Sequence, residues 1–336
     1  MPPSSASRLL VACSAVAAAV VVCSRPAHGE RRPSAGGWPS VALPADLTVA
    51  AETQADTVVL RADESPQVLF RGGEFIMGSE PAVALVALEL CKHDVRSVDA
   101  CEFPLRQEGL PLEELVQNEV AAHPVTLSAF WMDRTEVTVE AYARCLAVGA
   151  CAKTQFQRTV TPQNRLLPVT AVNHDDARAY CAFRGGRLPT EAEWERAAKG
   201  LRGRTFPWGF ELRSRASNHG TFRLIEIDGE RGLFPLSDDS DGFQDLAPVG
   251  SFPAGRTPEG LEDMAGNVAE WVLDNYADRY DPASAHDPKG PQTSPFRVIR
   301  GGSFVSGPSH LRTSARSFAS PGVRHPAIGF RCIKPG

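Results

Sequence analysis

The chain is poor in the features that mark membrane-spanning, nucleic-acid-binding and disordered proteins. None of its apolar runs reaches the roughly 18 residues that a membrane-spanning helix requires. Its 336 residues include 35 Lys and Arg against 40 Asp and Glu, a net charge of −5, so the basic excess of a nucleic-acid-binding domain is missing. Apolar residues make up 43% of the chain, which is too many for a disordered protein. These absences leave an ordinary folded protein.

Residues 1–29 have the pattern of a secretory signal peptide. Arg8 supplies the positive charge, residues 9–23 form an apolar stretch, and Ala27 and Gly29 are small residues at the positions where cleavage is expected. We therefore expect the chain to be exported to the periplasm or to the extracellular space.

A lipoprotein is the alternative form of export. Residues 10–13 (LVAC) match a lipobox in their letters. This motif precedes most of the apolar stretch, however, and Cys23 follows the bulky Val22. A soluble exported protein is therefore the preferred interpretation.

The cysteines fit an oxidising compartment. Removal of the signal would leave six of the eight cysteines, and an even number in an exported chain favours disulfides. Six cysteines allow many pairings, and free buried thiols remain the alternative. Short spacing suggests two pairs and leaves a third, long-range one: Cys91–Cys101, Cys145–Cys151 and Cys181–Cys332.

The rest of the chain reads as a linker followed by one domain. Residues 30–56 are rich in Arg, Pro, Ser, Ala and Gly and have no periodicity, which indicates a flexible linker. Residues 57–336 are short enough for one domain. With 28 Gly and 27 Pro in the whole chain, we expect short elements and many loops.

Local patterns predict individual strands near the start of this domain. Residues 67–70 (QVLF) and 75–77 (FIM) flank Gly72 and Gly73, which predicts two strands joined by a tight turn. Residues 125–132 are predicted as a third strand. Residues 80–122 resemble an insertion with some helix.

Three helices have start and stop signals. One is predicted from Thr138 to Gly149. A second begins at Asn173, with Asp176 three residues later, and ends at the glycines 185 and 186. The third begins with the Thr190 and Glu193 of a capping box and ends at Gly200. Beyond Gly200 we expect loops and short strands.

Seven segments in order resemble the formylglycine-generating enzyme family, also called sulfatase-modifying factors. The resemblance covers roughly residues 66–333. Each segment is weak alone, but the ordered set is highly specific. The segments are 72–79 (GGEFIMGS), 133–138 (DRTEVT), 186–195 (GRLPTEAEWE), 206–209 (FPWG), 264–271 (MAGNVAEW), 300–304 (RGGSF) and 329–332 (GFRC).

The resemblance implies a single α+β domain, loop-rich, C-type-lectin-like and low in regular secondary structure. It also implies that Cys181–Cys332 matches the long-range disulfide of the family. The family's oxidases convert a sulfatase cysteine to formylglycine with O₂ and with copper held by two active-site cysteines, since Cu(I) prefers thiolates. In this chain Ser306 and Leu311 fall at or near those cysteine positions. Copper is therefore not expected, and whether the chain is an enzyme stays open.

Calcium is the cofactor that the resemblance does imply, because calcium takes oxygen ligands. One family site matches the side chains of Asp263 and Glu270 and the carbonyls of Gly266 and Val268. A second matches the side chains of Asn218 and Asp241 and the carbonyls of His219 and Phe243. Solvated acidic loops are the alternative interpretation of both sets.

The family cleft is expected to bind a peptide, a protein or another exported small molecule. Its wall would consist of Ser303, Ser306, His310, Arg312 and Arg316. One hypothesis is a calcium-stabilised binding protein without cysteine-based oxidase activity. A second is an oxidative maturation enzyme with other chemistry, like the pyoverdine-maturation relatives, which are exported and lack the cysteine pair. A true formylglycine-generating oxidase is the third hypothesis and the least favoured.

Overall fold

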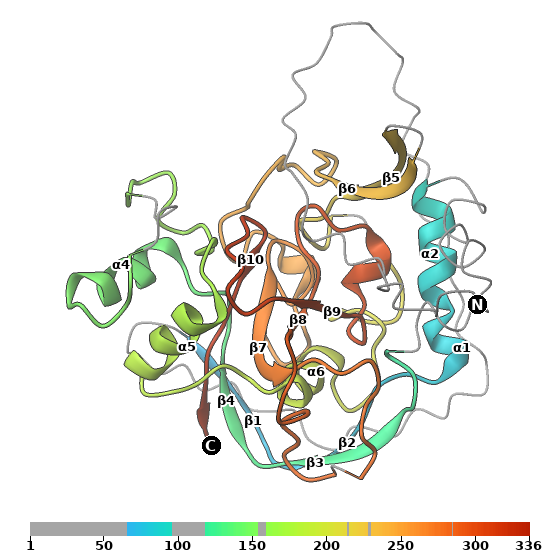
Figure 1. The fold of residues 1–336 in the computed structure, drawn as a ribbon, viewed down its shortest axis with the longest axis horizontal. Helices are drawn as coiled ribbons and strands as arrows, with labels where there is room; N and C mark the ends of the chain where they lie inside the picture. The colour runs from blue at the N-terminus through green and yellow to red at the C-terminus, as the bar shows by residue number, and fades with distance from the viewer. Residues whose placement is uncertain (1–65, 96–117, 154–158, 214, 228–229, 284) are drawn as a thin grey trace, which may run out of the picture. The chain divides into compact units, whose positions relative to one another are not determined.

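A computed structural model describes residues 66–95, 118–153, 159–213, 215–227, 230–283 and 285–336. All of them fall in one compact unit, 37–336. The predicted signal peptide (1–29) and linker (30–56) lie outside the described residues. Figure 1 shows short strands and helices joined by long loops, as the glycine and proline content predicts.

Two larger sheets organise the described residues. The first is antiparallel and brings together segments from both ends of the domain, in the order β1 (Gln67–Phe70), β4 (Phe130–Asp133) and β11 (Ile333–Pro335). The second has the order β10 (Ile328–Gly329), β7 (Ala269–Asn275), β8 (Arg297–Arg300) and β9 (Arg316–Ala319). Two pairs complete the sheets: β2 (Gly73–Met77) with β3 (His123–Leu127), and β5 (Thr221–Ile227) with β6 (Glu230–Leu236).

The predicted hairpin around Gly72 is wrong. β1 pairs with β4 and β2 pairs with β3, so the two strands belong to different sheets. The segment predicted as one strand, 125–132, is likewise two strands, with its break at Ser128 and Ala129. A Cβ on Gly72 would lie 2.9 Å from the Leu127 carbonyl oxygen. Gly72 therefore lies at a bend where its backbone passes close to that of Leu127, and it does not form the turn of a hairpin.

The three predicted helices are confirmed, with their caps. Thr138 accepts a hydrogen bond from the amide of Ala141, at the start of α4 (Val139–Ala147). Asn173 and Asp176 form a capping box at α5 (His174–Phe183), and Thr190 and Glu193 form another at α6 (Glu191–Lys199). The described part of the 80–122 insertion contains α1 (Pro81–Ala84) and α2 (Val86–Val95), and two 3₁₀ turns follow later, η2 (Pro253–Gly255) and η3 (Pro308–Leu311).

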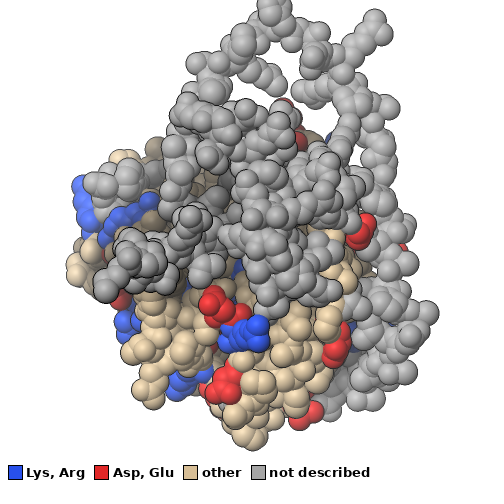
Figure 2. All heavy atoms as spheres, turned by 45° about the vertical axis from the view of Figure 1, so that its right-hand side comes forward, with Lys and Arg blue, Asp and Glu red and all other residues tan. Residues whose placement is uncertain are grey.

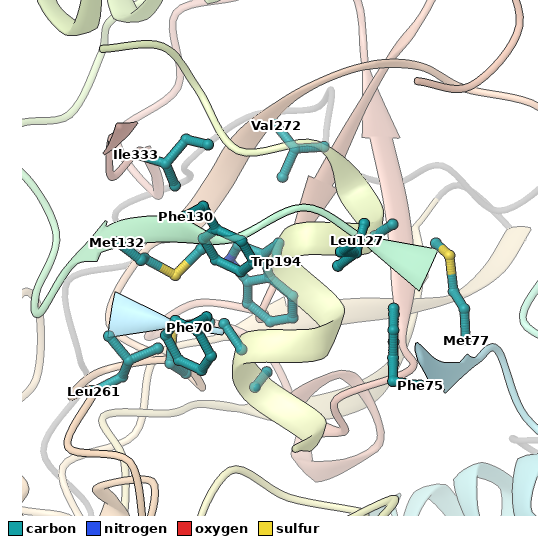
Figure 3. Packing of buried hydrophobic residues seen from close by; sticks show 14 of the residues in the cluster. Phe70, Phe75, Met77, Leu127, Phe130, Met132, Trp194, Leu261, Val272 and Ile333 are labelled. Carbon is teal, nitrogen blue, oxygen red and sulfur yellow. The ribbon is translucent and has the colours of Figure 1, made fainter. Parts of the chain in front are cut away.

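The core is centred on Trp194 of α6. Its indole is fully buried and packs among aromatic and aliphatic side chains from the bent strands (Figure 3). Phe70 of β1 stacks on Phe130 of β4 with ring centroids 5.1 Å apart. Every residue of α6 is buried, including Glu195, which pairs with Lys199 at 2.5 Å and with Arg300 at 2.6 Å. Because buried charges are expensive unless paired, the Glu195–Arg300 pair fixes how α6 lies against β8.

Two of the three predicted disulfides are confirmed. Cys145 is bonded to Cys151 and Cys181 to Cys332. Cys91 is also disulfide-bonded, but Cys101 lies outside the described residues, so the pairing predicted between them stays a prediction. The long-range disulfide joins α5 to the segment that leads into β11.

The described surface carries charges of both signs. On the face drawn in Figure 2, Lys and Arg side chains are interspersed with Asp and Glu. Among the helices within the described ranges, none has the length and apolarity that crossing a bilayer requires.

Candidate functional site

Three segments far apart in the sequence meet in one place. The amide of Asn267 donates to the carbonyl of Asn218 at 2.7 Å, and the amide of Phe304 donates to the carbonyl of Asn267 at 3.0 Å. The amide of Gly220 donates to the carbonyl of Ser306 at 3.0 Å. The loops 217–220, 263–268 and 301–306 therefore form one site, and they contain two of the recognised motifs and the start of the second proposed metal-ligand set.

Glycines permit this close approach. Gly301 and Gly302 both have positive φ, +91° and +68°. A Cβ on Gly266 would lie 2.1 Å from the carbonyl oxygen of Asn218, so a larger residue there would force the loops apart.

The Ser303–Ser306 turn is closed by its own hydroxyls. The amide of Ser303 donates to the Ser306 hydroxyl at 3.0 Å, and the amide of Ser306 donates to the carbonyl of Ser303 at 2.8 Å. The two hydroxyl oxygens are 3.3 Å apart. Ser306 therefore stabilises the turn at the position where the resemblance places a family cysteine.

Glu270, a predicted calcium ligand on β7, is a partner of Arg331. Both side chains are buried. The carboxylate accepts from the Arg331 guanidinium at 2.7–2.9 Å through both of its oxygens, and Oε2 also accepts from the indole N–H of Trp194 at 2.9 Å. Arg331 donates further to backbone carbonyls, including that of Glu262. The carboxylate of Glu270 is thus already neutralised and hydrogen-bonded by protein groups.

Glu136 is a further member of this site, and it was not among the candidate residues predicted from the sequence. One of its oxygens accepts from the side-chain nitrogen of Asn267 at 3.0 Å, and the other is buried with no nitrogen or hydroxyl donor, within hydrogen-bonding reach of the Asp263 carboxyl group. Burial raises the pKa of Glu136 well above its ordinary value, and the carboxylates of Asp263 and Glu270 act in the same direction. Burial also raises the pKa of Asp263. Glu136 lies in the DRTEVT segment, so the motif was the signal that could have identified it.

The second predicted ligand set is also brought together. The carboxylate of Asp241 accepts from the amide of His219 at 2.8 Å and from the amide of Phe243 at 2.9 Å. The side-chain nitrogen of Asn218 donates to the backbone carbonyl of Asp245 and to the side-chain oxygen of Asn267. The side-chain oxygen of Asn218 is buried and has no partner. Burial raises the pKa of Asp241.

These contacts bear on how well each set fits calcium. Across the described ranges, no three His, Cys, Asp or Glu side chains converge as metal ligands. An ion would therefore depend on amide and carbonyl oxygens, which calcium accepts. The second set fits better in one respect, because one of its own members, Asn218, has an unpartnered side-chain oxygen. Both oxygens of Asp241 already accept from backbone amides, as both oxygens of Glu270 do from Arg331 and Trp194. At the first set the buried oxygen without a donor belongs to the neighbouring Glu136. The predicted roles of Asp263, Gly266, Val268 and Glu270 stay predictions.

A family model, the sulfatase-modifying factor enzyme 1-like domain, matches residues 54–335 of the chain. The chain belongs to the sulfatase-modifying factor family.

Relatives in the family differ in activity. The formylglycine-generating enzyme of Mus musculus is 39% identical over 170 residues, 49% of this chain and 43% of that protein. A Mus musculus relative described as an inactive C-alpha-formylglycine-generating enzyme 2 is 38% identical over 173 residues, 49% of this chain and 48% of that protein. The chain spans about half the length of these relatives. Since the two identities are nearly equal, similarity alone does not decide activity.

A solved structure extends the family resemblance to the fold. PvdO from Pseudomonas aeruginosa matches with a TM-score of 0.57 at 25% sequence identity. The match covers 85% of this chain and 100% of PvdO. The predicted single, loop-rich domain of mixed α and β structure is therefore confirmed.

The family cleft prediction needs correction at two arginines. Arg312 and Arg316 are buried, and neither guanidinium is free to meet a ligand. Arg312 is held by both oxygens of Glu119 at 2.7 Å, and Arg316 by both oxygens of Glu191 at 2.6 and 2.9 Å. The Arg316 guanidinium also stacks 4.2 Å from the ring centre of Tyr280. Both arginines hold segments together instead of lining an open wall.

Leu311 is part of the buried apolar packing of this protein. It is 1% exposed and belongs to an apolar cluster with Val86, Leu90, Phe206 and Trp208. Its neighbour His310 is exposed and lies 3.1 Å from the Ser309 hydroxyl through Nδ1. Of the five predicted cleft residues, Ser306 and His310 therefore remain at least partly accessible, and Ser303 is buried beside Ser306.

Proposed function

We propose that this chain is an exported, calcium-stabilised member of the sulfatase-modifying factor family that binds a peptide or another exported ligand and has no cysteine–copper oxidase chemistry. One observation carries the central part of the proposal, the absence of cysteine–copper oxidase chemistry: no cysteine lies between Ser303 and Arg331. Ser306 closes a turn and Leu311 fills the core, so neither position supplies a thiolate. Cys181 and Cys332 are bonded to each other, which makes both unavailable to Cu(I).

Oxidase assays test this directly. The purified protein, given Cu(I), O₂ and a peptide with the sulfatase Cys-x-Pro-x-Arg motif, is expected to form no formylglycine. Mass spectrometry of the peptide measures the outcome, because conversion of the thiol to an aldehyde changes its mass. Restoring cysteines at 306 and 311 is not expected to rescue turnover, since Leu311 points into the core and a metal site needs fixed geometry as well as ligands.

An oxidase would give a different result. Copper-dependent aldehyde formation by the unmodified protein would overturn the proposal. A family member with copper-dependent oxidase activity, assayed in parallel, controls for the integrity of the peptide and of the copper reagent.

The second candidate function is oxidative maturation with non-cysteine chemistry. The match to PvdO favours it, because this chain covers all of PvdO but less than half of the mouse enzyme. A biosynthetic cluster beside the gene would favour this function, whereas a neighbouring sulfatase gene would favour formylglycine chemistry.

Calcium binding is proposed at the Asn218–Asp241 set, with the Asp263–Glu270 set as the second place. We expect calcium to raise the thermal midpoint and a chelator to lower it, since a ligand that binds only the folded state stabilises it, by about 2.7 kcal/mol at a hundredfold excess over Kd. Asp241→Asn is expected to abolish most of the shift, because it removes a formal charge from the site. Differential scanning fluorimetry measures both.

Glu140→Gln is the matched control for this measurement. Glu140 lies on the exposed face of α4, in a 3.4 Å pair with Arg165, so its loss should leave the calcium response unchanged. An Asp241→Asn protein that responds to calcium as the unmodified protein does would show that calcium does not bind at the Asn218–Asp241 set.

A further inference from the structure

The end of α4 presents an apolar tip to solvent. We define the α4 tip as residues 144–153. From Leu146 to Ala152 it contains no polar side chain. Val148 is 67% exposed, more than any other large hydrophobic residue among those described. Around it Ala147, Gly149, Ala150 and Ala152 are exposed as well.

The α4 tip is held in this exposed position. The Cys145–Cys151 disulfide closes it, and Cys145 itself is fully buried. The amide of Ala150 donates to the carbonyl of Cys145, and the Tyr142 hydroxyl donates to the carbonyl of Ala152 at 3.2 Å. Figure 1 shows α4 at the edge of the described fold, near α5. Because its base is fixed, the tip cannot fold back to bury Val148.

The surrounding sequence is basic, although the whole chain is acidic. The 34 residues from 141 to 174 contain no Asp or Glu and four Lys or Arg, at 144, 153, 158 and 165. Arg144 and Lys153 flank the apolar residues and are exposed. Within the described part of the chain neither has an ion-pair partner, whereas Arg165 pairs with Glu140. The tip thus combines an exposed apolar residue with uncompensated positive charge.

We propose that the α4 tip docks on the surface of an anionic membrane. Val148 and Leu146 would enter the boundary between headgroups and acyl chains, while Arg144 and Lys153 meet lipid phosphates. This is the combination by which peripheral proteins bind anionic bilayers. The inference concerns a surface apart from the loops of the candidate site and does not rest on the proposed function.

A bilayer suits this surface better than an acidic protein does. Stable protein–protein interfaces engage roughly 20–30 residues on each side, and the α4 tip has ten. Its apolar side chains are small and project from the end of a helix. Membrane docking needs only a few such side chains, provided that cations lie beside them.

Vesicle co-sedimentation tests the proposal. The full chain is expected to bind vesicles containing phosphatidylglycerol at low salt, and to bind phosphatidylcholine vesicles less, with the difference reduced at high salt by screening. Val148→Asp combined with Arg144→Glu is expected to lower the partition coefficient about tenfold or more. Both positions are exposed, so thermal midpoint and circular dichroism should be unchanged.

A matched variant elsewhere on the surface provides the control. Leu201→Asp with Arg202→Glu makes the same kind of change at an exposed apolar residue, 46% exposed, beside an exposed arginine. This variant should bind as the unmodified chain does. Since every variant retains the apolar stretch at 9–23, the comparison between variants carries the test.

Three results would overturn the proposal. They are no binding to anionic vesicles by the unmodified chain, equal binding by all variants, and equal loss in the two double variants. Retention of the unmodified chain on immobilised poly-glutamate without vesicle binding would instead indicate an acidic protein partner.

Discussion

Removing the Cys181–Cys332 disulfide is expected to lower the free energy of unfolding by about 5 kcal/mol. The two cysteines are 151 residues apart in sequence, and a cross-link restricts the unfolded chain more when it closes a longer loop. By the same scaling the Cys145–Cys151 disulfide, with a separation of 6, contributes only about 2 kcal/mol. The disulfide joining α5 to the C-terminal segment should therefore be the stronger stabiliser.

Paired replacements make the comparison clean. Cys181→Ala with Cys332→Ala leaves no free thiol at either position. Because both residues are buried, alanine is preferred to serine, which would bury a hydroxyl. Cys145→Ala with Cys151→Ala is the matched control. Urea denaturation measures both, and peptide mapping without reduction confirms the linkages. Equal losses in the two variants, or free thiols at 181 and 332, would contradict the expectation.

The helices could be predicted because their signals are local. A cap such as Asn173 with Asp176 acts within one turn, and the sequence that specifies it is contiguous. The strand pairing could not be predicted in the same way. Gly72 and Gly73 satisfy the local pattern of a hairpin, but the long-range pairing of Phe70 with Phe130 determines where β1 lies. Tertiary packing overrode the turn signal.

The candidate site shows the same division. Its loops could be located from the motifs, and the structure brings them together. The partners of its charged side chains could not be predicted, because Glu270 and Arg331 are 61 residues apart and Glu119 and Arg312 are 193 apart. An arginine in a loop looks like a cleft residue until its carboxylate partner is known. The motifs locate the loops of the site, and only the fold shows which of their charged side chains are already paired.

Glu270→Ala is expected to destabilise the protein by about 3–5 kcal/mol even when a chelator removes all calcium. Arg331 is fully buried, and among the described side chains the carboxylate that it hydrogen-bonds is that of Glu270, through three hydrogen bonds of 2.7–2.9 Å. Truncation would leave its guanidinium buried without a hydrogen-bonded carboxylate, with only the carboxylates of Glu136 and Asp263 nearby, and breaking a buried pair in this way costs much more than the pair itself contributes. The Trp194 indole N–H would lose its acceptor as well.

Two further variants distinguish this role from calcium binding. Glu270→Leu with Arg331→Met removes both charges and should lose less stability than Glu270→Ala, since the buried guanidinium is removed together with the carboxylate that it hydrogen-bonds. Glu140→Ala breaks only an exposed pair and should cost less than about 1 kcal/mol. Urea denaturation in chelator measures all three. If Glu270→Ala cost nothing in chelator but abolished the response to calcium, Glu270 would be a metal ligand and its pairing with Arg331 would contribute little to the fold.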